Sequence, residues 1–495
     1  MSSADGGGFP SWVLLETFVF RRDDDESFPD DTRAPIRASG TSSWGARFRV
    51  AFDLVEPPRI SRIYAQLPQP GFLDPMKSNP LSIVATHRHR ALLHVGTQTP
   101  EMLALQDFFI YSSAGENPCS VKALPPCREP DFDYYTRDDG SLPRRRRRRP
   151  TPPSDDAPPR PLNAQLMGLW CPSGGKEEEF VVAELSLYKP SNISKVFADI
   201  YLLRSSDHQL SGGGAWSSMR VLILSTDNPD DKDLWRLCCW ETETVIPFQR
   251  WLCWIDYHQG ILFCDMSKLP TPSVSFFRFP VDKSAPPTSA RSGSGSGSGS
   301  GSSSDSGSGS DADADIDTDD TSGLLYHGAS VVDHGRALKL VNGTRHDGIP
   351  FGALKPGTGF TITCHTLMLG SGGDIRSMAW EEDYTVTSRE LWDANHPDRL
   401  PRDILMFPRV DIDRPHVVHF LFMEFEYVKK KMWTVSIDMS TKTVQSFSMY
   451  INGNEGLQTD DDADLIIDKS MSPKPFLPCE FPRFCRLSRK RKDTE

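Results

Sequence analysis

Apolar residues recur at every second position in several stretches of the chain. From residue 433 to 439, tryptophan, valine, isoleucine and methionine alternate with threonine, serine and aspartate. Residues 440–442 are polar, and the alternation resumes over 447–451. A period of two places successive side chains on opposite faces of a strand, so this pattern predicts a hairpin with one buried face.

A second hairpin is predicted around Gly260. Residues 254–257 and 261–264 are rich in apolar side chains, and the three residues between them end in Gly260, which can take the positive φ of a tight turn. Residues 274–279 are expected to add a third strand to this meander. Helical patterns are few, and 388–391 is the best short candidate.

The turns of these hairpins share one order of residues: an apolar residue, an aspartate, a turn and another apolar residue. Asp256 and Asp438 fit this order, and Asp333 and Asp53 fit it more loosely. An aspartate ahead of a tight turn can accept hydrogen bonds from the amides of that turn, which gives the repeat a physical basis. Meanders that repeat at roughly 40–50 residues are typical of propeller blades. The sequence therefore predicts an all-β, propeller-like body of about six to eight blades, with two stacked β-sandwiches as the alternative.

Composition divides the chain into β blocks and polar segments that cannot bury a core. The predicted organisation is a mostly flexible region with one short strand (1–43), a β block (44–136), a disordered Pro/Arg-rich loop (137–162), a second β block (163–283), a disordered Ser/Gly/Asp linker (284–323), a third β block (324–482) and a basic tail (483–495).

The distribution of charge narrows the classes of partner. The net charge is −12, from 67 acidic and 55 basic residues, and residues 284–323 hold seven aspartates and one arginine. The β blocks are therefore close to neutral, which argues against a large basic surface for nucleic acid. No stretch reaches the ~18 apolar residues of a membrane helix. The apolar run 12–20 has no basic region ahead of it, so we expect no secretory signal and a nuclear or cytoplasmic protein.

Two basic runs are the strongest charged features. They comprise the residues Arg144, Arg145, Arg146, Arg147, Arg148 and Arg149, and the residues Arg489, Lys490, Arg491 and Lys492. Such runs are suited to an import receptor or another anionic partner. Aromatic residues do not interleave with either run, so stacking on nucleic-acid bases is not supported.

Histidine spacing does not assemble a metal site. His87 and His89 would share one face of a strand and His94 the other, whereas structural zinc needs a closed set of four ligands. His416 and His419 lie three apart, so on a strand they would face opposite ways. We therefore expect no metal and no cofactor.

Catalytic motifs are also missing from the sequence. There is no glycine loop followed by Lys-Ser/Thr for phosphate, and no Gly-x-Ser-x-Gly elbow after a strand. The adjacent acids at 381–383 indicate a solvated edge rather than an acid/base pair. We expect a protein that is not an enzyme.

One segment resembles a known family. Residues 254–265 read Trp-Ile-Asp-Tyr-His-Gln-Gly-Ile-Leu-Phe-Cys-Asp. This resembles the signature Trp-Val-Asp-x-x-x-Gly-Ile-Leu-x-Cys-Asp of a grass-expanded plant family defined by a domain of unknown function (number sixteen-eighteen). Residues 331–335, 383–392 and 433–438 resemble later strands of the same family.

The resemblance implies a β-rich fold, similar to plant F-box-associated propellers, and it implies no activity, cofactor or catalytic residue. Within the signature we expect Trp254, Asp256, Gly260 and Asp265 to determine the fold. The function expected from the sequence is a non-enzymatic scaffold for an unidentified protein partner. The alternatives are an enzyme whose site is assembled between blades and a nuclear regulator that uses its basic runs.

Overall fold

The computed structural model of the protein describes most of the chain outside its polar segments. The described residues are 9–69, 71–72, 80–98, 104–113, 121–130, 132, 159–172, 179–190, 195–205, 216–225, 231–280, 322–370, 375–424, 431–451, 465 and 475–485.

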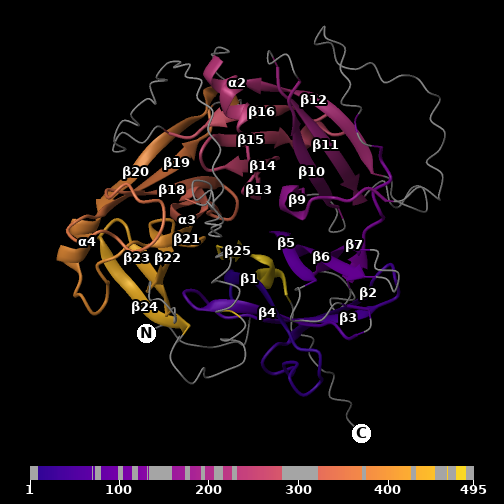
Figure 1. Ribbon diagram of the computed structural model, residues 1–495, viewed down its shortest axis with the longest axis horizontal. Helices are drawn as coiled ribbons and strands as arrows, with labels where there is room; N and C mark the ends of the chain where they lie inside the picture. Colours follow the sequence, from indigo (N-terminus) through magenta and orange to yellow (C-terminus); the bar gives the residue numbers. More distant parts are fainter. Residues whose placement is uncertain are drawn as a thin grey trace, which may run out of the picture.

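The described strands form six consecutive groups of four, and one further strand joins the first group. In Figure 1 these groups, named blades 1 to 6 in chain order, are arranged around a common centre. The strands of blades 1 to 3 are β1 (Val13–Arg21), β2 (Ile36–Thr41), β3 (Arg47–Asp53), β4 (Ile60–Gln66) and β25 (Leu477–Cys479); β5 (Leu81–His87), β6 (Arg90–Gln98), β7 (Ala104–Ser112) and β8 (Val121–Ala123); β9 (Met167–Trp170), β10 (Val181–Tyr188), β11 (Phe197–Arg204) and β12 (Ser217–Ser225).

The second half of the chain repeats this arrangement. The strands of blades 4 to 6 are β13 (Thr244–Phe248), β14 (Trp251–Asp256), β15 (Gly260–Asp265) and β16 (Val274–Arg278); β17 (His327–Val332), β18 (Ala337–Arg345), β19 (Phe360–Met368) and β20 (Ala379–Thr387); β21 (Met406–Val410), β22 (Val417–Met423), β23 (Met432–Asp438) and β24 (Thr443–Ile451). The described helices are short: α2 (Asp231–Cys238), α3 (Ser322–Tyr326), α4 (Ser388–Ala394), η1 (Ala164–Leu166), η2 (Met266–Lys268), η4 (Ile375–Ser377) and η5 (Phe481–Phe484).

The predicted hairpins are confirmed. β14 and β15 pair from Trp251 opposite Asp265 to Asp256 opposite Gly260, and β23 pairs with β24 across the expected polar turn. The predicted helix at 388–391 is α4, which begins at a capping box between Thr387 and Glu390.

The hydrophobic cores lie between successive blades, which closes the blades into a ring. Four clusters join blades 1 and 2, 2 and 3, 3 and 4, and 4 and 5, and the largest cluster joins blades 5, 6 and 1. Members of these clusters, in ring order, are Phe48 and Phe109, Leu92 and Leu203, Leu202 and Leu262, Phe263 and Leu338, and then Val341, Val418 and Leu14. The propeller-like prediction is confirmed: the strands of the described residues form six blades and not two stacked sandwiches.

Blade 1 is assembled from both ends of the described chain. Its order is β2-β3-β4-β1-β25, with β1 parallel to β4 and antiparallel to β25. Arg409 on β21 donates a hydrogen bond of 2.9 Å from Nε to the carbonyl of Phe476, just ahead of β25, so the same segment also contacts blade 6. Residues 1–43, where one short strand was predicted, contain both β1 and β2.

Blades 3 and 4 form one eight-stranded sheet, because their outer strands β12 and β16 pair in parallel. Their inner strands β9 and β13 are also in contact, so the sheet curls nearly into a closed barrel. Each blade's first strand contacts the first strand of the next blade from β1 to β21, and these inner strands surround the centre of the ring.

Candidate functional site

A hollow of about 810 Å³ lies at the centre of the ring. Its walls are formed by the inner strands β5, β9, β13 and β17 and by β25, and part of its rim by the turns that follow β5, β13 and β17. All six blades contribute a lining residue, in ring order Pro478, Ala85, Trp170, Val245, Ala329 and Ile412. We call it the central hollow.

The central hollow is basic. Of the described residues, Arg88, Arg250, Arg336 and Arg483 line it, against one carboxylate, that of Glu480. A concave site lined mainly by one sign of charge attracts ligands of the opposite sign. The chemistry of the hollow therefore favours an anionic ligand.

Three residues that line the hollow have a positive φ, which is uncommon for residues other than glycine. Arg88, Gln249 and His334 line the hollow with φ values of 54°, 50° and 52°. Each lies in the turn after an inner strand, and the turns at 88–89 and 249–250 have only two residues. Two-residue hairpin turns favour Asn and Gly where φ is positive, and such costly backbone positions concentrate at functional sites.

Two of the arginines are weakly neutralised. The Arg88 guanidinium donates a hydrogen bond of 2.9 Å to the carbonyl of Pro172 and forms no ion pair with any described residue. The Arg336 side chain is 78% exposed, and its nearest carboxylate, that of Asp333, is 3.7 Å away. These two side chains are the most available to a ligand.

The other two arginines already have partners. Nε of Arg250 lies 3.4 Å from the Asp265 carboxylate. Nδ1 of His334 lies 3.0 Å from Nη1 of Arg483 and 2.9 Å from Oε1 of Glu480. These contacts hold the rim in place. Arg483, which the sequence assigned to the basic tail, lies in η5.

His87 and His89 do not share one strand, contrary to the expectation from their spacing. β5 ends at His87, and the chain turns through Arg88 and His89 before β6 begins. Burial first, and then the charges of Arg88 and His89, lower the pKa of His87 to about 3. His87 is therefore neutral at pH 7, and its Nδ1 accepts a hydrogen bond of 2.8 Å from the backbone N–H of Cys171. This bond joins blade 2 to blade 3.

The signature residues of 254–265 lie in blade 4, beneath the central hollow's rim rather than on it. Trp254 is fully buried, and its indole Nε1 donates a hydrogen bond of 2.8 Å to the carbonyl of Leu166. Asp256 is also buried and accepts hydrogen bonds of 2.8 Å and 2.9 Å from the backbone N–H groups of Glu241 and His258. Burial raises the pKa of Asp256, and these hydrogen bonds offset part of that rise.

Gly260 and Asp265 complete the same hairpin. Gly260 has a φ of 149°, and a Cβ at this position would lie 2.4 Å from the carbonyl oxygen of Phe277. Asp265 accepts a hydrogen bond of 3.1 Å from the backbone N–H of Ser267 and pairs with Arg250. Asp265 thus links the signature hairpin to the central hollow.

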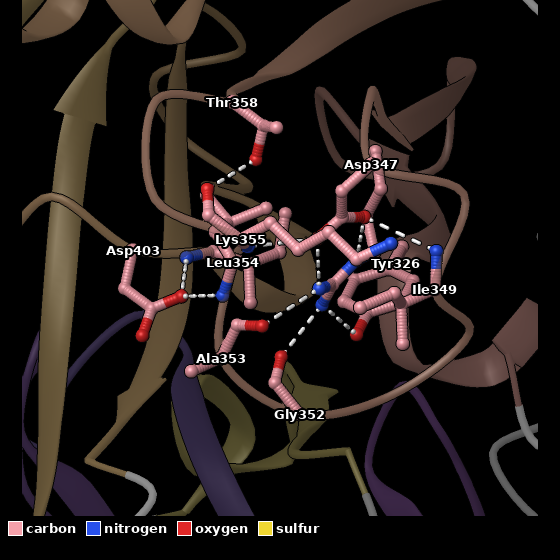
Figure 2. Close-up of polar contacts among 11 residues, drawn as sticks. Tyr326, Asp347, Ile349, Gly352, Ala353, Leu354, Lys355, Thr358 and Asp403 are labelled. Carbon is pink, nitrogen blue, oxygen red and sulfur yellow. Dashed lines mark hydrogen bonds and ion pairs between the residues drawn. The ribbon is translucent and has the colours of Figure 1, made fainter.

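A second polar cluster lies in blade 5. Figure 2 shows this cluster, in which Tyr326, Asp347 and the loop residues Gly352 and Ala353 lie close together. At its centre is an ion pair of 2.7 Å between Arg345 and Asp347, whose side chains are 4% and 0% exposed.

The Arg345 guanidinium also donates to the carbonyls of Gly352 and Ala353, at 2.7 Å and 3.1 Å, while Asp347 accepts from the backbone N–H of Lys355 at 3.1 Å. The hydrogen bonds from Arg345 come first in lowering the pKa of Asp347 far below its usual range. Arg345 and Asp347 neutralise each other and bind the backbone of residues 352–355, so the pair fastens the loop between β18 and β19.

The two predicted basic runs, 144–149 and 489–492, lie outside the described residues. Within the described part of the chain, no group of three or more His, Cys, Asp or Glu side chains is placed to hold a metal ion. None of the described helices has the length and apolar character needed to cross a membrane.

The arginines of the central hollow were not found from the sequence. Arg88, Arg250, Arg336 and Arg483 are spread over almost 400 positions and share no motif. A weak local signal exists for two of them: Arg88 and Arg250 lie in two-residue turns, where Asn or Gly is usual. The four arginines come together only when the blades are arranged in a ring.

Comparisons with known proteins match one part of the chain. A family model described as "Protein of unknown function (DUF1618)" matches residues 309–419. This range contains blade 5 and the beginning of blade 6, and the segment 254–265 lies outside it. No curated protein matches the chain significantly.

Among solved structures, the chain has a weak likeness to a polysaccharide lyase of a new family, PL25, an ulvan lyase determined with and without a bound sugar. The identity is 7% and the TM-score 0.27, over 90% of this chain and 86% of the lyase. A TM-score this low supports no conclusion about function. What the comparisons establish is that residues 309–419 contain a domain of unknown function.

Proposed function

We propose that this protein is a binding module whose central hollow holds an acidic segment of a partner protein. The observation that carries the proposal is the convergence of Arg88, Arg250, Arg336 and Arg483 on one hollow against the single carboxylate of Glu480. Because Arg88 and Arg336 are the least neutralised, they would make the first contacts with a ligand carboxylate or phosphate.

The shape of the hollow supports a segment of chain rather than a flat surface. Its volume of about 810 Å³ can hold several side chains. Its lining combines charged residues with apolar ones such as Val245, Ile246 and Ile412. An acidic peptide with interspersed apolar residues would match both parts.

We also propose that binding takes place in the nucleus or cytoplasm. This rests on the basic runs at 144–149 and 489–492, which are suited to an import receptor. The similarity of 254–265 to a plant family is consistent with a scaffold, since that family implies no catalytic residues.

The test is binding of a fluorescein-labelled deca-aspartate peptide, measured by fluorescence anisotropy at low and high salt, with a deca-asparagine peptide alongside. We expect the acidic peptide alone to bind, with affinity falling as salt rises. Replacing both Arg88 and Arg336 by alanine should weaken binding at least tenfold. Replacing the exposed Arg389 on α4, far from the hollow, should leave it unchanged.

Equal binding of the two peptides would refute recognition of charge. A double variant that binds as well as the unaltered protein would show that the acidic peptide binds elsewhere.

A further inference from the structure

Blade 6 contains a chain of hydrogen bonds that the binding role does not use. Nε2 of His419 lies 3.3 Å from Oδ2 of Asp411, and its Nδ1 lies 2.7 Å from Oγ of Ser436. The hydroxyl of Ser446 then donates a hydrogen bond of 2.9 Å to Oγ of Ser436. An acid, an imidazole and two hydroxyls are thus connected in one line.

The strand register builds this line. His419 on β22 is directly opposite Ser436 on β23, and Ser436 is directly opposite Ser446 on β24. Beyond this pair the register shifts, because Ile437 pairs with Val444 and leaves Gln445 as an extra residue on β24. Bulges of this kind are frequent beside active sites, where they redirect a side chain.

The directions of the hydrogen bonds follow from the chemistry of the groups. Burial by itself would raise the pKa of Asp411, but His419 and Arg414 outweigh it and lower the pKa. Asp411 is therefore ionised at pH 7 and can only accept, so Nε2 of His419 donates to it. In the neutral imidazole that the reaction needs as its base, Nδ1 accepts from the Ser436 hydroxyl, whose oxygen accepts from Ser446. Each hydrogen bond in the line then has its donor on the Ser446 side and its acceptor on the Asp411 side.

Burial decreases along the line, from the carboxylate at one end to the Ser446 hydroxyl at the other, as a reactive site requires. The side chains of Asp411 and His419 are 2% and 3% exposed, and Trp12 packs against His419 with ring centroids 5.7 Å apart. Ser446, at the other end, is only half-buried. It lines a hollow of about 560 Å³ between blades 6 and 1.

We propose that Ser446 is the nucleophile of an acyl-transfer site that opens into this hollow, a further activity separate from binding in the central hollow. Oγ of Ser446 would attack the carbonyl carbon of an ester while its proton passes to Ser436, whose own proton passes to Nδ1 of His419. The carbon–oxygen bond to the alcohol then breaks, and the alcohol leaves with the proton returned along the same line. Water releases the acid by the same steps in reverse, so ester and water give acid and alcohol.

The lining of the hollow narrows the class of ester. Three carboxylates, those of Glu56, Asp411 and Asp413, line it against the one guanidinium of Arg414, which is already bound to Asp411 at 2.7 Å. A negatively charged substrate would be repelled. The site therefore suits a small ester that is neutral or positively charged.

The experiment uses a fluorophosphonate probe on the full chain, followed by intact mass and peptide mapping. The probe forms a Ser–O–P bond with loss of fluoride and a proton. We expect one adduct, on Ser446, in the folded protein and none after denaturation. S446A should abolish the adduct, and S436A should slow its formation at least tenfold.

The matched control is S448A, which alters an exposed serine two residues further along β24 and should react like the unaltered protein. Melting temperatures of all variants show whether each is folded. If the folded, unaltered protein gains no adduct at excess probe, or if the adduct lies on another serine, the hydrogen-bond line is structural and the proposal fails. Because none of the arginines of the central hollow takes part, this failure would leave the peptide-binding test unaffected.

Discussion

The carboxylate of Asp265 lies 3.4 Å from Nε of Arg250, and this contact joins the hairpin β14–β15 to the rim of the central hollow. Asp265 itself is buried, whereas the Arg250 side chain is 40% exposed. Asp265 therefore belongs to the buried hairpin, whereas Arg250 lines the central hollow. It also reduces the positive charge that the hollow presents.

Replacing Asp265 by asparagine should strengthen binding of the deca-aspartate peptide. The change removes a negative charge but keeps an oxygen that can accept from Ser267. We expect affinity to rise about two- to fivefold, which corresponds to the ~0.4–1 kcal/mol of a partly exposed ion pair. Fluorescence anisotropy checks this, with D393N on α4 as the control. Weaker binding would instead mean that Asp265 is needed to hold Arg250 in position.

Replacing Trp254 by alanine should destabilise the protein by roughly 3–5 kcal/mol, since a large buried side chain is lost and a cavity is left. The indole also donates to Leu166, which would lose its partner. Trp235 on α2 is 65% exposed, and W235A is the matched control with little expected change. Chemical denaturation measures both. An unchanged midpoint for W254A would contradict the burial of this side chain.

Alanine at Gly260 should cost more stability than alanine at Gly335. Both glycines have positive φ, 149° and 90°, so both variants carry a backbone strain of about 1–3 kcal/mol. Only the Cβ at 260 would meet the Phe277 carbonyl, at 2.4 Å, whereas the one at 335 meets nothing within 4 Å. We expect G260A to be the less stable by a further ~1–3 kcal/mol in thermal unfolding. Equal losses would show that the hairpin relaxes around the added methyl group.

Asparagine at Asp347 should remove a stabilising contribution that depends on pH. The pKa of Asp347 is lower in the folded protein than its unfolded value of about 3.9, so the contribution is fully present above pH ~4 and is lost as the pH falls below that value. At pH 7 we expect D347N to lose roughly 3–5 kcal/mol, because Arg345 is left buried without its partner.

The check is urea unfolding of D347N and of the unaltered protein at pH 7, 4 and 3. The difference between them should shrink toward low pH, while the exposed-site variant D393N shows no such trend. A difference that stays constant with pH would assign the loss to packing instead of charge.

The strands were predictable from sequence because their signal is local. Alternation over 433–439 and the apolar run 254–257 locate β23 and β14, but burial does not alternate along them. Thr434 and Ser436 are buried with Val435 and Ile437, and every residue of β14 is buried, so the expectation of one solvated face is wrong for both strands. The aspartate turns were also predictable: Asp256 and Asp438 each accept hydrogen bonds from the amides two and three residues ahead. This is why the propeller could be inferred before its blades could be counted.

Neither candidate site has a local signal that joins its residues into one site. Arg88 and Arg336 meet only when blades 2 and 5 are placed in the ring. His419 was weighed against His416, its neighbour in sequence, but its partners are Asp411 in a loop and Ser436 on the next strand. Finding that pairing requires the register of β22 against β23, which depends on turn lengths and packing rather than on residue type.

The pairing of β1 with β25 has a consequence for how the protein is made. Leu15 is opposite Leu477, so the strand that completes blade 1 is synthesised long after β1 has left the ribosome. At about 5–20 residues per second, roughly 20–90 s separate the synthesis of the two strands. During that interval β1 carries an open edge, and blade 6 lacks the contact from Arg409 to Phe476. The nascent protein can build its blades in order, but it can close its ring only after β25 has been synthesised.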